Sequence, residues 1–188
     1  MSQLKELTWE HHKEAERQEF VKVLLSGKIH PEFYATYLWN QHKKYDLLEA
    51  LAGMHGLLDD LPDIRRKNKI EKDFLELWSN DTPPVIVPAV NDYISHMRSI
   101  MDDADKLTAH LYVMHMGDLS GGQMIAKKVP GSGKMYQFAE DHATLKETIR
   151  AKTDDSMADE ARLCFSFATK TFQDLMELDC EHYLEHTD

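Results

Sequence analysis

Residues 110–123, with the sequence HLYVMHMGDLSGGQ, place three glycines inside a stretch whose apolar residues have helical spacing. Each glycine in a helix interior costs roughly 1 kcal/mol relative to alanine, so these glycines need a reason. Gly117 and Gly121 are four residues apart and therefore share one helix face. Two explanations for these glycines remain open at this point. The first is a structural one, in which another helix packs closely against them or the helix kinks. The second is that a flat ligand lies against a backbone that carries no Cβ atoms.

The rest of the chain also has the pattern of helices. Only 6 of the 188 residues are Pro and 8 are Gly, and the segment 82–88, which contains three prolines, must be extended. The sequence therefore predicts an all-α fold, a single-domain helical bundle over residues 1–188. We expect helices from Ser2 to Gly27, from Pro31 to Gly53–Gly56, over 65–77, 88–102, 106–128 and 136–152, and from a capping box at Ser156 and Asp159 through Phe165, Phe172, Leu175 and Tyr183.

Composition and charge exclude several classes of protein. Hydrophobic residues make up 42% and charged residues 29% of the chain, which is typical of a globular protein. A net charge of -11 disfavours nucleic acid and anionic lipid as partners. The longest apolar stretches are far shorter than the ~20 residues of a membrane helix, and the N-terminus lacks a secretory signal, so we expect a soluble cytoplasmic protein without an anchor.

The cysteine and histidine residues indicate which kinds of site the chain could contain. Cys164 and Cys180 have no disulfide or zinc-site spacing, and we expect both to be idle thiols. The 11 histidines and 10 methionines suit soft metal or porphyrin surroundings, although composition alone is a weak signal.

Several polar residues could serve a ligand. Asp118 stands beside the glycine strip, and at an ordinary pKa of ~3.9 it would be an ionised acceptor able to hold water. Lys5 lies two turns before His12 on the same face, so the pair could bind an anionic plate that carries a metal, whereas His11 points ~100° away. A helical histidine is more often a surface or core residue than a ligand. Similarly, Lys146 and Arg150, four apart, could clamp a carboxylate or mark a solvated face.

The run Gly117-Asp118-Leu119-Ser120-Gly121-Gly122-Gln123, preceded by 110–112, resembles the distal-helix signature of the haem oxygenases. The segment 12–16, HKEAE, is similar to the segment that carries their proximal haem ligand. The resemblance extends from about Lys5 to Phe172. It implies a haem held between the first helix and a glycine-kinked distal helix.

The resemblance also implies roles for individual residues. His12 would be the proximal iron ligand, and Phe165 would lie beside the haem edge. Gly117 and Gly121 would form the distal wall, with Ser120 and Gly122 shaping the kink. Asp118 would hold a water, supported by Tyr45. The haem propionates would be bound by Lys5, Tyr112, Lys146 and Arg150.

Three positions depart from the family pattern. Met114 stands where the family usually has arginine, His115 where it has tyrosine, and Ala168 where many members have asparagine. Methionine can neither donate a hydrogen bond to distal waters nor pair with Asp118. We expect His115 to point elsewhere on the helix, which leaves the distal hydrogen-bond network weakened.

The function implied by the resemblance is oxidative cleavage of haem b, which is both substrate and cofactor. O2 and electrons from an external reductant, ferredoxin or a soluble reductase, would yield biliverdin, with the IXα isomer expected, together with CO and ferrous iron. A bilin-using enzyme would act downstream. A non-catalytic haem carrier or sensor and a thiaminase-like enzyme of similar helical architecture remain alternatives. A di-iron carboxylate bundle is disfavoured because paired Glu-x-x-His motifs are absent from the sequence.

Overall fold

The computed structural model describes residues 2–182, with side chains described through residue 178. Within this part the regular structure is helical, which confirms the all-α prediction. The α-helices are α1 (Leu4–Leu7), α2 (Trp9–Glu16), α3 (Glu19–Leu25), α4 (Pro31–Met54), α5 (Lys67–Leu77), α6 (Pro88–Ser99), α7 (Ala104–Leu119), α8 (Gly122–Ile125), α9 (His142–Ala151) and α10 (Ala158–His182), with short 3-10 turns η1 (Lys134–Tyr136) and η2 (Asp155–Met157).

The N-terminal region is three helices, so the expectation of one helix from Ser2 to Gly27 is wrong. The buried Thr8 hydroxyl donates to the Leu4 carbonyl at 2.7 Å, and this competing bond falls where α1 gives way to α2. Gln18 then adopts an extended backbone (φ -63°, ψ 144°), which turns α3 away from α2. The predicted stop at Gly27 is confirmed, since this residue has a φ of +75° after α3.

The middle of the chain follows the predicted boundaries closely. α4 begins at Pro31, and the preceding His30 caps it by accepting a hydrogen bond from the Glu32 N–H. The proline-rich segment 82–87 is non-helical, and α6 begins at Pro88 but ends at Ser99, three residues before the predicted end.

The glycine-bearing helix does not continue to Lys128. α7 ends at Leu119, Ser120 has a non-helical backbone (φ -115°, ψ -94°), and α8 restarts at Gly122. Gln123 stabilises the break, because its side-chain amide donates to the carbonyls of Asp118 at 3.0 Å and Tyr136 at 2.9 Å. The expected kink is therefore a full interruption of the helix.

Two further boundaries differ from the prediction. The helix expected over 136–152 begins only at His142, where Asp141 accepts a hydrogen bond from the Thr144 N–H. The capping box expected at Ser156 and Asp159 is wrong, because Asp154 accepts from the Ser156 N–H instead and α10 begins at Ala158. Tyr183, expected in the last helix, lies outside the described residues.

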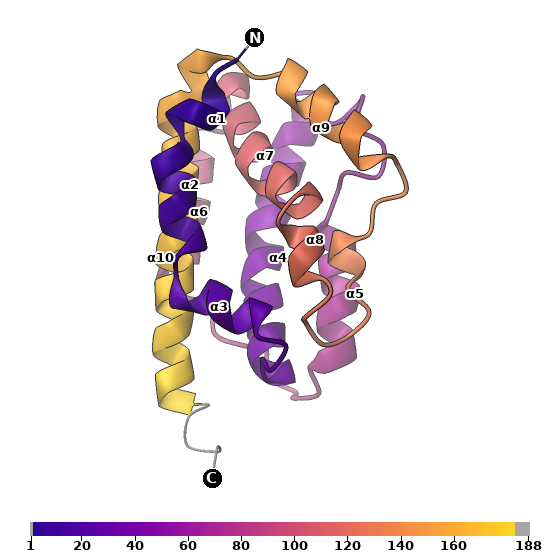
Figure 1. Ribbon diagram of the computed structural model, residues 1–188, viewed down its shortest axis with the longest axis vertical. Helices are drawn as coiled ribbons and strands as arrows, with labels where there is room; N and C mark the ends of the chain where they lie inside the picture. The colour runs from indigo at the N-terminus through magenta and orange to yellow at the C-terminus, as the bar shows by residue number, and fades with distance from the viewer. Residues whose placement is uncertain (1, 183–188) are drawn as a thin grey trace.

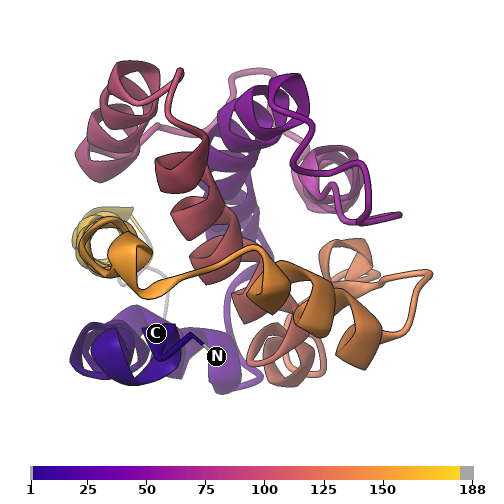
Figure 2. The same cartoon turned by 90° about the horizontal axis from the view of Figure 1, so that it is seen from above.

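α10 organises the bundle by packing against α2 and α3 on one side and against α6 and α7 on the other (Figures 1 and 2). α4 packs against α5, α6 and α7, and α9 lies along α7. Because α4 and α7 carry buried residues around most of their circumference, they form the centre of the core. None of the described helices combines the length and apolar character needed to cross a bilayer.

Candidate functional site

Two of the three motif glycines face open space. A Cβ atom built on Gly117 or Gly121 has no other side chain or neighbouring element within 4 Å, and both residues are exposed. A Cβ on Gly122, in contrast, would lie 2.7 Å from Cδ1 of the buried Tyr136 ring. Close packing therefore explains Gly122 and does not explain Gly117 or Gly121. The strip formed by Gly117 and Gly121 is bare backbone of the kind that a flat ligand can approach.

His12 lies on α2, and α10 packs against both α2 and the glycine-bearing α7 (Figure 1). The His12 ring stacks on Phe165 of α10, with ring centroids 5.3 Å apart and planes at 17°. Its Nε2 lies 2.8 Å from a carboxylate oxygen of Glu16, one helical turn later. A carboxylate on one ring nitrogen fixes the ring and leaves the other nitrogen as a metal ligand, and the 39% exposure of the side chain makes it accessible.

The neighbouring His11 has a different environment. It is exposed and lines a surface groove with Glu14, Ser166 and Lys170. The two adjacent histidines are therefore separated as predicted from helical geometry. Glu16 was not among the predicted site residues, although its spacing of four from His12 was a readable signal.

Asp118 and Tyr45 form a buried pair next to the glycine strip. The Tyr45 hydroxyl donates to Oδ2 of Asp118 at 2.5 Å, and it also lies 3.4 Å from the Met114 carbonyl oxygen. Burial raises the pKa of Asp118 to about 7, although the charge of His115 and the hydrogen bond from Tyr45 act in the opposite direction. The expectation of a carboxylate with an ordinary pKa is thus wrong. Asp118 can take up or release a proton near neutral pH.

His115 does not point away from this network. Its Nε2 lies 2.8 Å from Oε2 of Glu49, both side chains are almost completely buried, and its ring meets the Tyr45 ring edge-on at 5.2 Å. His115 Nδ1 is buried without a hydrogen-bond partner among the described residues. The expectation that His115 lies apart from Asp118 is corrected, since its charge lowers the pKa of Asp118.

Glu49 ties this network to the start of α5. Its carboxylate accepts hydrogen bonds from the Arg66 N–H at 2.6 Å and the Lys67 N–H at 2.9 Å. Burial alone would raise the pKa of Glu49, but the hydrogen bond and charge of His115 outweigh it and lower the pKa. Sequence reasoning missed Glu49, although its spacing of four from Tyr45 places both on one face of α4.

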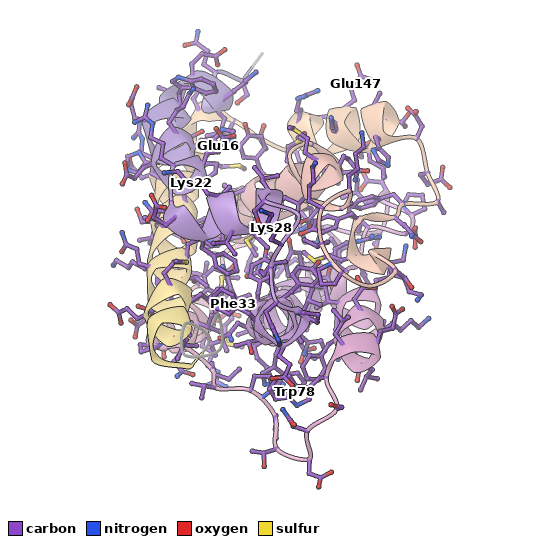
Figure 3. The ribbon with its side chains drawn as sticks, turned by 60° about the horizontal axis from the view of Figure 1, so that its bottom comes forward. Glu16, Lys22, Lys28, Phe33, Trp78 and Glu147 are labelled. Atoms are coloured by element: carbon purple, nitrogen blue, oxygen red, sulfur yellow. The ribbon has the colours of Figure 1, made fainter. Side chains whose placement is uncertain are left out.

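The residues predicted to bind carboxylates lie on α1, α7 and α9. Tyr112 on α7 is half-buried, and burial raises its pKa while the positive charge of Arg150 lowers it. Lys146 and Arg150 lie on α9, which packs against α7, and Lys5 lies on α1 (Figure 1). In Figure 3, the label of Glu16 marks α2 and that of Glu147 marks α9. The structure thus brings Tyr112 close to Arg150 and places the two lysines on neighbouring elements.

This set of groups fits a flat, anionic, metal-bearing ligand. It offers an imidazole fixed by a carboxylate, a strip of backbone without Cβ atoms, a buried carboxyl that titrates near neutrality, and cations at one end. Haem combines these properties, since it presents iron to an imidazole and two carboxylates to the cations.

Comparison with known proteins agrees with this geometry. The protein-family model described as Heme oxygenase matches residues 1–177. The curated protein named Heme oxygenase 1 from the cyanobacterium Synechocystis is 30% identical over 200 residues, which cover 93% of this chain and 83% of that protein. The protein named Heme oxygenase from Porphyra purpurea is 27% identical over 201 residues, covering 93% of this chain and 85% of that protein.

Solved structures show the same similarity in three dimensions. The crystal structure of haem oxygenase-1 from Synechocystis in complex with haem superposes with a TM-score of 0.81 at 25% identity, covering 99% of this chain and 98% of that chain. Haem oxygenase from Leptospira interrogans has a TM-score of 0.77 at 29% identity, covering 90% of this chain and 96% of that one. The chain belongs to the haem oxygenase family.

Proposed function

We propose that this protein cleaves haem oxidatively to biliverdin, CO and ferrous iron, with O2 and electrons from an external reductant. The observation that carries the proposal is the buried Asp118 beside the bare Gly117 and Gly121 strip on α7, which packs against α10 as does the helix α2 that presents His12. A haem carrier or sensor needs a ligand and cations, but it has no use for a buried carboxyl that exchanges a proton near pH 7. The pair of Asp118 and Tyr45 therefore favours a catalyst over a carrier.

Haem binding in this proposal uses groups from six helices, α1, α2, α7, α8, α9 and α10. His12 would hold the haem iron, Glu16 would fix the imidazole through its contact with a ring nitrogen, and Phe165 would support the imidazole and the haem edge. Gly117 and Gly121 lie against the distal face, while Ser120 and Gly122 set the break that ends this wall. The propionates are bound by Lys5, Tyr112, Lys146 and Arg150.

The distal residues act on protons and on oxygen geometry. Haem, when bound, supplies the iron at which O2 is reduced. Gly117 and Gly121 leave room on one side of the haem and thereby favour one edge of the ring, which we expect to give the IXα isomer. Asp118 holds a water and passes a proton through it, since its pKa of about 7 makes both protonation states accessible. Tyr45 orients the carboxyl group by its 2.5 Å hydrogen bond.

The reaction needs partners that we propose from its chemistry. The electrons come from ferredoxin or another soluble reductase in the cytoplasm, and the product passes to a bilin-using enzyme. A thiaminase-like reaction at Cys164 is disfavoured, because this thiol is fully buried and burial raises its pKa to about 12, which leaves no thiolate at neutral pH.

The test uses absorption spectra of the purified protein with added haem. We expect a histidine-ligated haem spectrum in the wild type and in His11→Ala, and its loss in His12→Ala unless imidazole is added. Incubation with a reductant and O2 should then convert the bound haem to biliverdin. Haem that stays intact in an otherwise normal complex would identify a carrier. A normal spectrum in His12→Ala combined with its loss in His11→Ala would move the ligand to His11.

A further inference from the structure

A second group of metal-ligating side chains lies on the other side of α10 from the proposed haem site. His96 of α6, His110 of α7 and Glu160 of α10 each direct one ligand atom to a common point, and these atoms lie within 4.8 Å of one another. Glu160 and Phe165 are five residues apart, about 140° around α10, so α10 presents them to different neighbours. Figure 2 shows α6 across α10 from α2.

The three side chains already contact one another. Oε1 of Glu160 lies 2.5 Å from Nε2 of His96 and 2.8 Å from Nε2 of His110. The His110 side chain is completely buried, while His96 and Glu160 are 20% and 11% exposed. The cluster is therefore closed on its inner side and reachable from solvent on its outer side.

We propose that His96, His110 and Glu160 form a binding site for a divalent transition-metal ion, with Zn²⁺ as the best match. Two imidazoles and one carboxylate are a common protein ligand set for zinc, in which water occupies the fourth position. His96 and Glu160 are partly exposed, so solvent can supply that water. Around a tetrahedral ion with bonds of about 2.0–2.1 Å the ligand atoms are roughly 3.3 Å apart. The carboxylate must therefore withdraw by less than about 1 Å, and the two imidazole nitrogens, which lie within 4.8 Å of each other, must approach by up to about 1.5 Å.

The surroundings also suit a metal ligand. The Tyr93 oxygen lies 3.0 Å from His110 Nδ1, so it can accept a hydrogen bond from the Nδ1–H group when Nε2 binds the ion.

One buried cation, Lys44, lies near the proposed metal site. Lys44 is buried with its ammonium 4.9 Å from the centre of the Tyr93 ring, and burial lowers its pKa to about 8. Its ammonium lies over the Tyr93 ring, and its charge also acts on His110. Phe167 packs against both the His96 and Tyr93 rings, which holds them in place.

The experiment measures Zn²⁺ bound to the haem-loaded full chain, by equilibrium dialysis followed by elemental analysis. We expect about one zinc per chain in the wild type and in the control His55→Ala, which removes an exposed histidine outside the cluster. His96→Gln and Glu160→Gln should lower the affinity at least tenfold, and Tyr93→Phe should lower it by about 10- to 100-fold through its effect on His110. Co²⁺ added in place of zinc to the haem-free chain should give the visible absorption of a tetrahedral site in the wild type and in His55→Ala, and not in His96→Gln or Glu160→Gln.

Circular dichroism should be used to check that each variant folds. Glu160→Gln is chosen because glutamine retains the shape of the glutamate side chain. If all variants bind as much zinc as the wild type, or if the wild type binds none at micromolar zinc, the proposal is overturned. The cluster is then a set of hydrogen bonds between three helices. Because the readout is metal content, the result does not depend on haem turnover.

Discussion

The chemistry at the level of single residues centres on Asp118. Its carboxyl group is buried, is bonded to Tyr45 and has a pKa of about 7, whereas an aspartate in the unfolded chain titrates at about 3.9. At Asp118 the native state therefore binds more protons than the unfolded state between these two pH values, and the contribution of Asp118 to stability falls as the pH rises through this range. The cost of burying the charge is complete above pH 7 and absent below about pH 4.

The first prediction at this scale concerns Asp118→Asn. The variant should lower the rate of biliverdin formation by about 100-fold or more, because an amide cannot exchange the proton. The same change should raise the free energy of unfolding of the haem-free protein at pH 8 by roughly 1–3 kcal/mol, since one pKa unit corresponds to about 1.4 kcal/mol. The gain should be smaller at pH 5. Equal stability changes at both pH values, measured by urea titration, would contradict the raised pKa.

A second prediction concerns His115, which occupies a position where the family usually has tyrosine. His115→Gln keeps a donor for Glu49 but removes the charge that lowers the pKa of Asp118, so the Asp118 titration followed by ¹³C NMR should move to higher pH. His115→Phe removes the donor as well and should cost about 1–3 kcal/mol of stability, because one hydrogen bond of the buried Glu49 is lost. An unchanged Asp118 titration in both variants would separate His115 from the distal network.

At the scale of elements, the break between α7 and α8 determines what the motif glycines do. Gly117 lies within α7 and borders open space, while Gly122 begins α8 and lies under the Tyr136 ring. The three glycines of this motif are therefore needed for two different physical reasons. We propose that haem lies against Gly117 and Gly121, which border open space, and not against Gly122, which is covered by Tyr136.

The same substitution should therefore have opposite effects at these two positions. Gly117→Ala should leave the haem-free fold intact or stabilise it by up to about 1 kcal/mol, because alanine is the better helix former, and it should weaken haem binding. Gly122→Ala should destabilise the fold by about 1–3 kcal/mol, since its Cβ would overlap Tyr136. Thermal unfolding and haem titration of both variants test this pair. Loss of stability in Gly117→Ala without any loss of haem affinity would show that its open face has another purpose.

At the scale of the whole molecule, three of the four proposed propionate-binding residues are positively charged although the chain as a whole is negative. The chain has a net charge of -11, yet Lys146 and Arg150 lie on α9, which packs against the helix of Tyr112, and Lys5 lies on α1. Exposed ion pairs contribute only about 0–1 kcal/mol each, so these cations should orient a dianionic ligand more than they bind it.

Removing two of these cations tests whether they orient the haem more than they contribute to its affinity. The double variant Lys146→Ala and Arg150→Ala should weaken haem binding by roughly 3- to 30-fold and mix the biliverdin isomers, while the histidine-ligated spectrum persists. The matched control, Lys72→Ala with Arg98→Ala, removes one lysine and one arginine from exposed positions on α5 and α6. Equal losses of haem affinity in both double variants would indicate a general effect of net charge.

Much of this protein could be predicted from residues that are close in the chain. Helical spacing, the start at Pro31, the extended proline segment and the stop at Gly27 are local effects, and the structure confirms them. The motif at 117–123 and the segment at 12–16 allowed the family to be predicted, because each consists of consecutive residues that can be recognised without the fold. The roles of the individual site residues remain predictions.

Only the tertiary structure decided which groups share an environment. Burial of Asp118 depends on the helices packed around it, and its raised pKa cannot be read from its neighbours in sequence. The contact between Glu49 and His115 spans 66 positions, and the cluster of His96, His110 and Glu160 joins three helices. Gly117 and Gly122 differ for the same reason, since the space beside a backbone is set by segments that arrive from elsewhere in the chain. Local periodicity therefore determined the helices, while long-range packing determined desolvation, hydrogen-bond partners and open space.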